Sequence, residues 1–170
     1  LSYGVESASQ RLLDWYNKKV TLNQIWDAVK NARKVGIDML IANFILGAPI
    51  ETREEIIETL DFSMKLGIDF PQFHILGIIP GNWIWDKMVE EKRIDPDECW
   101  EVGTAVLPIP LSELMERIRQ THIKFMQRPS FISRQIYKTL ISKYRLRAVL
   151  QNLKNIENWN IWNNWKPFWG

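Results

Sequence analysis

The sequence predicts an α/β fold in which a segment of a parallel (β/α) barrel is followed by a helical C-terminal extension. The first observation behind this prediction is an internal repeat of 31 residues, which aligns Thr21 with Thr52 and Asp38 with Asp69. The second is the pattern within each copy, where a helix start, a glycine and a short apolar run follow in the same order. Helices that alternate with strands favour parallel pairing and right-handed crossovers.

Each copy of the repeat begins with a predicted helix. The first copy has Thr21 followed three residues later by Gln24, and the second copy repeats this spacing from Thr52. This is the spacing of a capping box, in which the two side chains satisfy free N–H groups of the first turn. Apolar residues then recur at helical spacing. Gly36 and Gly67 end the helices, because glycine adopts the left-handed conformation without a Cβ penalty.

Beyond each glycine, a short apolar run predicts a buried strand. Residues 39–46 and 70–79 are too short and too rich in β-branched and aromatic side chains to be further helices. Residues 2–6 form a predicted earlier strand. We therefore expect the barrel segment over residues 1–108, and a helical extension with a tryptophan-rich tail over residues 109–170.

In parallel α/β folds, functional residues lie at the C-terminal ends of strands and in the loops that follow. This rule selects three loops, at residues 6–10, 47–52 and 77–82. These loops contain glycines that allow close approach of the backbone, prolines that stiffen the turns, and polar side chains. We therefore expect a ligand where the three loops meet.

Three polar residues within the predicted strands are candidates for contact with a substrate. Gln72 and His74 are two residues apart, so both side chains point to one face, which in a barrel can be the interior. Asn43 interrupts an otherwise apolar strand. The structural alternative for each is a side chain that is hydrogen-bonded to a neighbouring strand.

The composition excludes several classes of protein. No apolar run reaches the roughly eighteen residues that span a bilayer. Cys99 is the only cysteine, which excludes an internal disulfide framework and a metal site built from cysteines of this chain. We expect a cytoplasmic protein. Because the chain begins without an initiator methionine, we also expect a piece of a longer protein.

The C-terminal part leaves two further functions open. Eight basic residues and no acidic residue lie between Lys124 and Lys154, which fits a solvated helix face or an RNA-binding module. Tryptophans at 159, 162, 165 and 169 fit peripheral contact with a membrane, or packing on the barrel. The solvated face is the simpler interpretation, and nucleic acid is not the expected partner.

Three ordered motifs resemble the second half of the radical S-adenosylmethionine (SAM) core. They are the segments Gly4–Leu13, Phe44–Thr52 and Phe73–Leu76, the last followed by Pro80-Gly81. Three motifs at βα-unit spacing are far more specific than one glycine pattern. The segments Leu111–Leu114 and Phe125–Pro129 are similar to the helical extension of the subgroup that carries an N-terminal cobalamin-binding domain.

The resemblance implies roles for individual residues. In this family, polar residues at the end of one strand hydrogen-bond SAM, the segment after the next strand packs beside the adenine, and backbone after the third completes that pocket. The matching positions are Glu6, Ser7 and Ser9, then Gly47, Pro49 and Glu51, then Leu76 and Pro80. Ala8 and Ile50 stand where many relatives have glycine, so we expect turns that differ in detail.

The resemblance also implies cofactors and a reaction. Its members hold a 4Fe-4S cluster through three closely spaced cysteines, which this chain lacks. The cluster loop, and any cobalamin-binding domain, would therefore lie in the N-terminal half of the same protein, and this chain alone would be inactive. The intact protein would cleave SAM reductively to a 5′-deoxyadenosyl radical. Methylation, cyclisation or oxidoreduction of a small-molecule or lipid-like substrate would follow.

Overall fold

The computed structural model describes residues 1–97 and 107–153 of the 170-residue chain. The chain divides into two compact units between Phe125 and Met126. The first unit contains a sheet with its helices, and the described part of the second consists of two helices. Cys99 and the tryptophan-rich tail lie outside the described residues.

Three parallel strands form the centre of the first unit and confirm the predicted fold class. They pair in chain order as β1 (Ser2–Glu6), β2 (Ile41–Leu46) and β3 (Phe70–Ile75). The third strand ends four residues earlier than predicted. The reason is that β2 ends at Leu46, whose carbonyl oxygen accepts the Leu76 N–H at 2.8 Å, so later residues have no strand to pair with.

Within residues 1–97 and 107–125, five helices complete the first unit. They are α1 (Gln10–Trp15), α2 (Leu22–Lys34), α3 (Arg53–Lys65), α4 (Trp83–Glu90) and α5 (Leu111–Gln127), whose last two residues belong to the second unit. Both predicted capping boxes are formed, at Thr21 and at Thr52. Gly36 and Gly67 follow the two helices with φ of +79° and +77°, in the left-handed region predicted for them.

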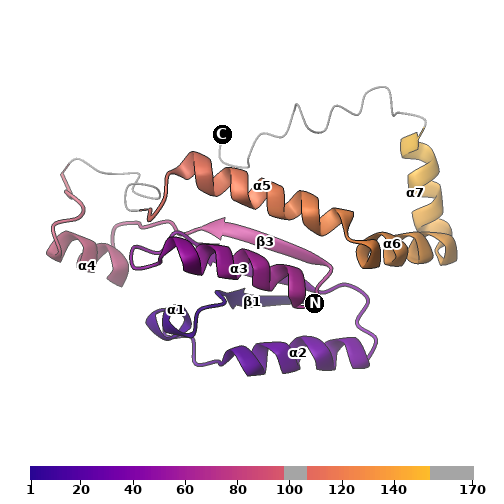
Figure 1. The fold of residues 1–170 in the computed structure, drawn as a ribbon, viewed down its shortest axis with the longest axis horizontal. Helices are drawn as coiled ribbons and strands as arrows, with labels where there is room; N and C mark the ends of the chain where they lie inside the picture. The colour runs from indigo at the N-terminus through magenta and orange to yellow at the C-terminus, as the bar shows by residue number, and fades with distance from the viewer. Residues whose placement is uncertain (98–106, 154–170) are drawn as a thin grey trace. The chain divides into compact units, whose positions relative to one another are not determined.

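The sheet buries one face and leaves the other open. Ala42, Phe44 and Phe73 are buried on the covered face, whereas the strand neighbours Asn43 and His74 are half-buried or exposed. Side chains alternate between the two faces of a strand. Helices α2, α3 and α5 all pack on the face that carries the buried side chains (Figure 1). In a closed barrel, the open face would line the interior.

Helix α5 packs on the sheet through its apolar stripe. Leu114, Ile118 and Phe125 are buried, and the His122 Nε2 lies 3.1 Å from the Pro71 carbonyl oxygen. The His122 ring also lies 5.2 Å from the Phe73 ring. The predicted helical extension begins at residue 109, but its first helix, α5, packs on the sheet. The boundary between the two compact units therefore lies later, after Phe125.

The second unit contains α6 (Pro129–Ile141) and α7 (Lys143–Leu153), as the predicted helical extension requires. The Gln135 side chain accepts a hydrogen bond from Arg145 Nη1 at 3.4 Å, which joins the two helices. Across residues 1–97 and 107–153, no helix combines the length and the apolar character needed to cross a membrane.

A buried ion pair joins the two copies of the repeat at the N-terminal edge of the sheet. The Asp69 Oδ2 accepts hydrogen bonds from Arg33 Nη2 at 2.7 Å and from the Leu40 N–H at 2.8 Å. Asp69 is only 4% exposed. Arg33 also donates to the Gly67 carbonyl oxygen at 2.9 Å, so one guanidinium fixes the loop before β3.

Replacing Asp69 by Asn should lower the free energy of unfolding of the chain by about 3 kcal/mol, because it leaves a partly buried guanidinium without its carboxylate. Urea unfolding followed by circular dichroism would measure the change. Asp61→Asn, on the exposed side of α3, is the matched control and should change stability by less than about 0.5 kcal/mol. Equal effects of both substitutions would contradict a stabilising role of the Arg33–Asp69 ion pair.

Candidate cofactor-binding site

The three selected loops follow strands that end at the same edge of the sheet. Parallel pairing places the end of β1 beside β2, and β2 beside β3. Contacts between the following elements hold them together. The Ser9 hydroxyl donates to Glu55 at 2.7 Å, and the rings of Trp15 and Trp83 lie 4.7 Å apart. The three strand ends therefore lie side by side, and a ligand where the three loops meet stays a prediction.

Glu6 ends β1 in an unusual backbone conformation. Its φ is +68°, and the pairing of β1 with β2 shifts between Gly4 and Glu6. A non-glycine residue held at positive φ is strained and is common at ligand sites. The Glu6 carboxylate pairs with Lys18 Nζ at 2.6 Å, and a Cβ at Gly4 would meet both groups. The Glu6–Lys18 pair therefore lies over the open side of β1.

Lys18 is a candidate that the sequence did not reveal. It follows α1 in a turn where Asn17 has φ of +55° and the Lys18 N–H donates to the Leu13 carbonyl oxygen at 2.8 Å. This turn brings the Lys18 ammonium group back to the end of β1, although Lys18 lies twelve residues after Glu6 in the chain. The sequence could not reveal this role, because nothing in the residue pattern distinguishes Lys18 from the adjacent Lys19.

Ser7 and Ser9 use their hydroxyl groups within the protein. The fully buried Ser7 Oγ accepts the Ser9 N–H at 3.0 Å and lies 3.3 Å from Thr59 Oγ1. Ser9 caps α1 and donates to the Glu55 carboxylate. Both residues thereby shape the loop after β1, and direct contact of either with a cofactor stays a prediction.

Glu55 links this loop to the start of α3. Its carboxylate accepts from the Ser9 hydroxyl, from Arg11 at 2.5 Å and from the Thr52 N–H at 2.9 Å. Burial opposes ionisation, yet these hydrogen bonds hold the pKa of Glu55 to about 2. Arg11 also donates to the Ile50 carbonyl oxygen at 2.8 Å. The sequence predicted Glu55 as a cap, but not its contacts with the first loop.

Glu51 closes the loop that begins at Gly47. Its Oε2 accepts the N–H of Gly47 at 2.5 Å and that of Ala48 at 3.2 Å, and Gly47 has φ of +88°. The residue is 4% exposed. Burial raises the pKa of Glu51 to about 7, against the lowering effect of the two N–H groups. These contacts give Glu51 a structural role in closing the loop, and its contact with a cofactor stays a prediction.

Three buried polar atoms near these loops have no hydrogen-bond partner. Among the described residues, these atoms are Trp15 Nε1, Tyr16 Oη and Glu51 Oε1. Burial, with the Glu51 and Glu6 carboxylates nearby, raises the pKa of Tyr16 well above 10. Buried polar atoms are normally satisfied by protein, water or ligand, so their presence beside the strand ends marks a place where a ligand can add contacts.

The remaining predicted residues of the loops differ in exposure. Pro49 is buried, and its carbonyl oxygen accepts from both Nη atoms of Arg93 at 3.3 Å. Leu76 is half-buried and packs against an apolar cluster that consists of Ile78, Ile84, Trp85, Met88 and Ile94. Pro80 is exposed in the loop before α4. Leu76 thus lies at the border of a buried apolar cluster, and its position beside adenine stays a prediction.

The predicted substrate-facing residues lie on the open face of the sheet. Asn43 donates to the Ser2 hydroxyl at 2.8 Å, and its Oδ1 lies 3.4 Å from His74 Nε2. Gln72 is exposed on the same strand as His74. A row of polar side chains therefore crosses all three strands. The hydrogen bonds of Asn43 to both neighbouring strands also fit the purely structural role that the sequence left open for it.

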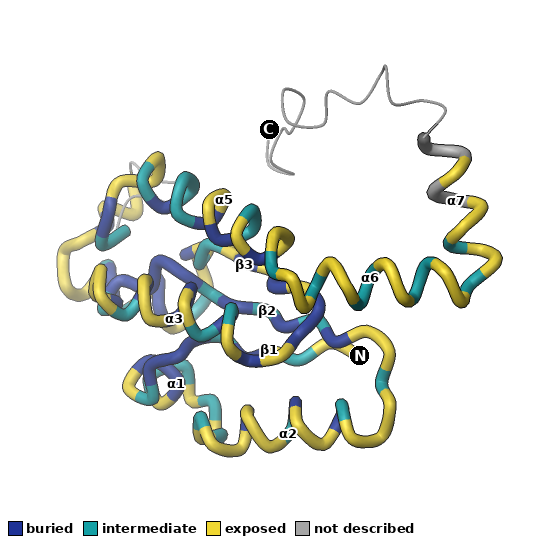
Figure 2. The backbone as a smooth tube through the Cα atoms, turned by 45° about the vertical axis from the view of Figure 1, so that its right-hand side comes forward, coloured by how far each residue is buried: buried dark blue, intermediate teal, exposed yellow. Residues whose placement is uncertain are grey.

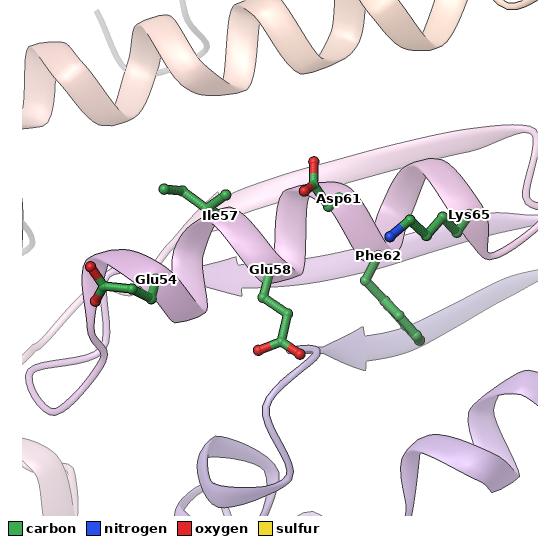
Figure 3. Close-up of a pocket in the computed structure, with 6 residues that line it drawn as sticks. All are labelled: Glu54, Ile57, Glu58, Asp61, Phe62 and Lys65. Atoms are coloured by element: carbon green, nitrogen blue, oxygen red, sulfur yellow. The ribbon is translucent and has the colours of Figure 1, made fainter.

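A separate pocket lies on the outer side of α3 (Figure 3). It contains none of the predicted site residues, and its lining consists of Glu54, Ile57, Glu58, Asp61, Phe62 and Lys65. All six belong to one helix, and no strand end contributes to the pocket. We therefore assign the candidate site to the strand ends. Within the described ranges, no three His, Cys, Asp or Glu side chains come together as a metal site would require.

Comparison with known proteins supports the resemblance to the radical SAM core. Residues 1–63 match the family model of the Radical SAM superfamily. The chain is 33% identical over 157 residues to an uncharacterized methyltransferase of Pyrococcus horikoshii, covering 88% of this chain and 34% of that protein. It is 24% identical over 135 residues to the anaerobic magnesium-protoporphyrin IX monomethyl ester cyclase of Rubrivivax gelatinosus, covering 78% of this chain and 24% of that protein. The chain thus spans about a third of one relative and a quarter of the other.

Glu51→Gln should remove a pH dependence from the stability of the chain. Because the folded-state pKa is raised from 4.5 to about 7, the native state binds more protons than the unfolded state between these values. Stability is therefore highest below pH 4.5 with respect to this group, and falls by up to about 3 kcal/mol as the pH rises through 7.

Urea unfolding at several pH values between 5 and 8 would measure the difference between the native chain and the Glu51→Gln variant. The variant should become more stable relative to the native chain as the pH rises. Glu54→Gln, exposed on the same helix start, is the control and should show no such trend. A constant difference for Glu51→Gln would show that this carboxyl is ionised throughout.

Proposed function

We propose that the chain, whose residues 1–63 match the family model of the Radical SAM superfamily, supplies the SAM-binding and substrate-facing part of an enzyme of this type. The observation that carries the proposal is the Glu6–Lys18 pair at the open end of β1. It stands beside buried polar atoms that have no partner, at the edge where the three strands end.

The Glu6–Lys18 pair fits the polar part of SAM. SAM carries an ammonium group and ribose hydroxyls that donate hydrogen bonds, and a carboxylate that accepts them. The Glu6 carboxylate is the complementary acceptor, and Lys18 Nζ is the complementary cation. Both side chains are partly exposed, at 18% and 32%, so a ligand can reach them. The role of these residues is to orient SAM at the strand ends.

The loop after β2 fits the adenine by packing. The N–H groups of Gly47 and Ala48 are already bound by Glu51, and the Pro49 carbonyl oxygen by Arg93. This segment therefore has little hydrogen-bonding capacity left at these groups. Leu76 adds an apolar surface at the same edge. An aromatic base beside this surface would be held by contact area and by exclusion of water.

The chain does not itself fit the iron-sulfur cluster. Such a cluster needs thiolate ligands, and Cys99 is the only cysteine. We propose that the N-terminal half of the intact protein holds the cluster, which with SAM would supply the radical chemistry of the family. The likeness of the helical extension to the cobalamin-binding subgroup extends the proposal to cobalamin as a further cofactor.

The open face of the sheet would hold the substrate. Asn43, Gln72 and His74 offer hydrogen-bond donors and acceptors there, next to the partly exposed Ile45. The relatives are named as a methyltransferase and a cyclase. We therefore propose methylation or cyclisation of a small or lipid-like molecule, in preference to a simple oxidoreduction.

Substitution of the charged pair tests the proposal. In the intact protein, Glu6→Gln and Lys18→Met should each weaken SAM binding by roughly tenfold to a hundredfold, because each removes a charge-assisted hydrogen bond. Isothermal titration calorimetry would measure the dissociation constant. Lys19→Met, at the adjacent exposed position, is the matched control and should leave it unchanged. Unchanged affinity in Glu6→Gln and Lys18→Met would refute the site.

The chain without its N-terminal half should not cleave SAM, because one cysteine cannot replace the three thiolates of the cluster loop. Chromatographic detection of 5′-deoxyadenosine, after anaerobic treatment with iron, sulfide and dithionite, would measure cleavage. The intact protein under the same conditions is the positive control. Cleavage by this chain alone, at the rate of the intact protein, would contradict the expectation.

A further inference from the structure

Helix α6 exposes its apolar side. Ile132, Ile136, Tyr137, Leu140 and Ile141 are between 45% and 69% exposed, and they recur at helical spacing along one side of the helix. Figure 2 shows no buried residue anywhere along α6. We call these five residues the apolar face of α6. Such a face on an amphipathic helix is normally covered.

The polar side of α6 faces its neighbour. Arg134, Gln135, Lys138 and Thr139 are all less exposed than the apolar face. The hydrogen bond between Gln135 and Arg145 shows that this side meets α7. The orientation is thus the reverse of that in a two-helix hairpin with an internal apolar core. The α6–α7 unit presents the apolar face outward instead.

The charge of this region favours one kind of partner. Eight basic residues and no acidic residue lie between Lys124 and Lys154, and Lys143 and Arg147 are exposed on α7. Tyr144, exposed at the start of α7, adds an amphipathic ring. A helix pair with an exposed apolar side, several basic residues and an exposed tyrosine has the composition of an interfacial membrane anchor.

An anionic bilayer surface explains both observations together. RNA would bind the basic residues but would leave the aliphatic side chains of α6 in water. A neutral apolar protein surface would cover α6 but would not complement the positive charge. Lipid headgroups complement the charge, and the underlying acyl chains accept the apolar side chains. We propose that the α6–α7 unit binds peripherally to anionic membranes, with the apolar face of α6 inserted at the level of the headgroups.

Co-sedimentation with vesicles tests this proposal on the full chain. Vesicles of phosphatidylcholine with phosphatidylglycerol should bind the chain, and vesicles of phosphatidylcholine alone should bind it at least tenfold more weakly. Ile136→Ser with Leu140→Ser should lower the partition coefficient by roughly tenfold or more, because two apolar side chains lose their burial. Thr139→Ser, on the polar side of the same helix, is the control and should change it little.

A second variant tests the charge separately. Lys143→Glu with Arg147→Glu should weaken binding by more than tenfold, since each basic residue near an anionic surface contributes about fivefold. Added salt should weaken the binding of the native chain in the same direction. Circular dichroism establishes that each variant retains its helices, and the charge variant remains informative if the apolar variant does not fold.

Several outcomes would overturn the proposal. One is the absence of binding to anionic vesicles at low salt. Another is binding that is lost when the chain is truncated after Ile156 but unaffected by Ile136→Ser with Leu140→Ser, which would assign the membrane contact to the tail. A third is binding to a single-stranded RNA, unaffected by the apolar variant and without vesicle binding, which would assign the basic residues to nucleic acid.

Discussion

Parallel hydrogen bonding between β1, β2 and β3 is the constraint from which the arrangement of the candidate site follows. It makes the chain return across the sheet after each strand, so helices connect the strands and all three strands end at one edge. Glu6, Gly47 and Leu76 become neighbours through this pairing, although they are far apart in the sequence. The loops contribute the chemistry, but the sheet determines where that chemistry meets.

A carboxylate stabilises the connections at each edge of the sheet. At the N-terminal edge, Asp69 binds Arg33 and the backbone of Leu40. At the C-terminal edge, Glu55 binds Ser9, Arg11 and the first turn of α3. Both carboxylates accept backbone N–H groups as well as a guanidinium, which is the arrangement in which a buried or half-buried charge is well compensated.

The sequence predicted those parts of the fold that depend on local chemistry. The capping boxes at Thr21 and Thr52, and the left-handed glycines at 36 and 67, act within a few residues and leave a direct sequence pattern. Strands β2 and β3 were recognised because each is a short apolar run that follows a glycine. The end of β3 was placed too late, because pairing with β2, and not composition, terminates it.

What the sequence did not predict depends on contacts between distant segments. Lys18 reaches Glu6 only because a turn follows α1. Helix α4 was not predicted, although Asn82 caps it by accepting the Trp85 N–H at 2.8 Å. Its bulky residues Ile84, Trp85 and Met88 are buried by tertiary packing, which a periodicity argument over eight residues does not reveal. The hydroxyl of Ser7 is likewise bound by Thr59, a partner from α3.

The order of the strands has a practical consequence for work with this protein. Within the part of the chain that the structure describes, β1 and β3 each pair on one side only, so each presents a row of backbone donors and acceptors at its other side. Such rows recruit strands from other molecules and promote inclusion bodies during recombinant expression. Co-expression with a segment that pairs with the free side of β1 would cover that row and lower the tendency of the chain to aggregate.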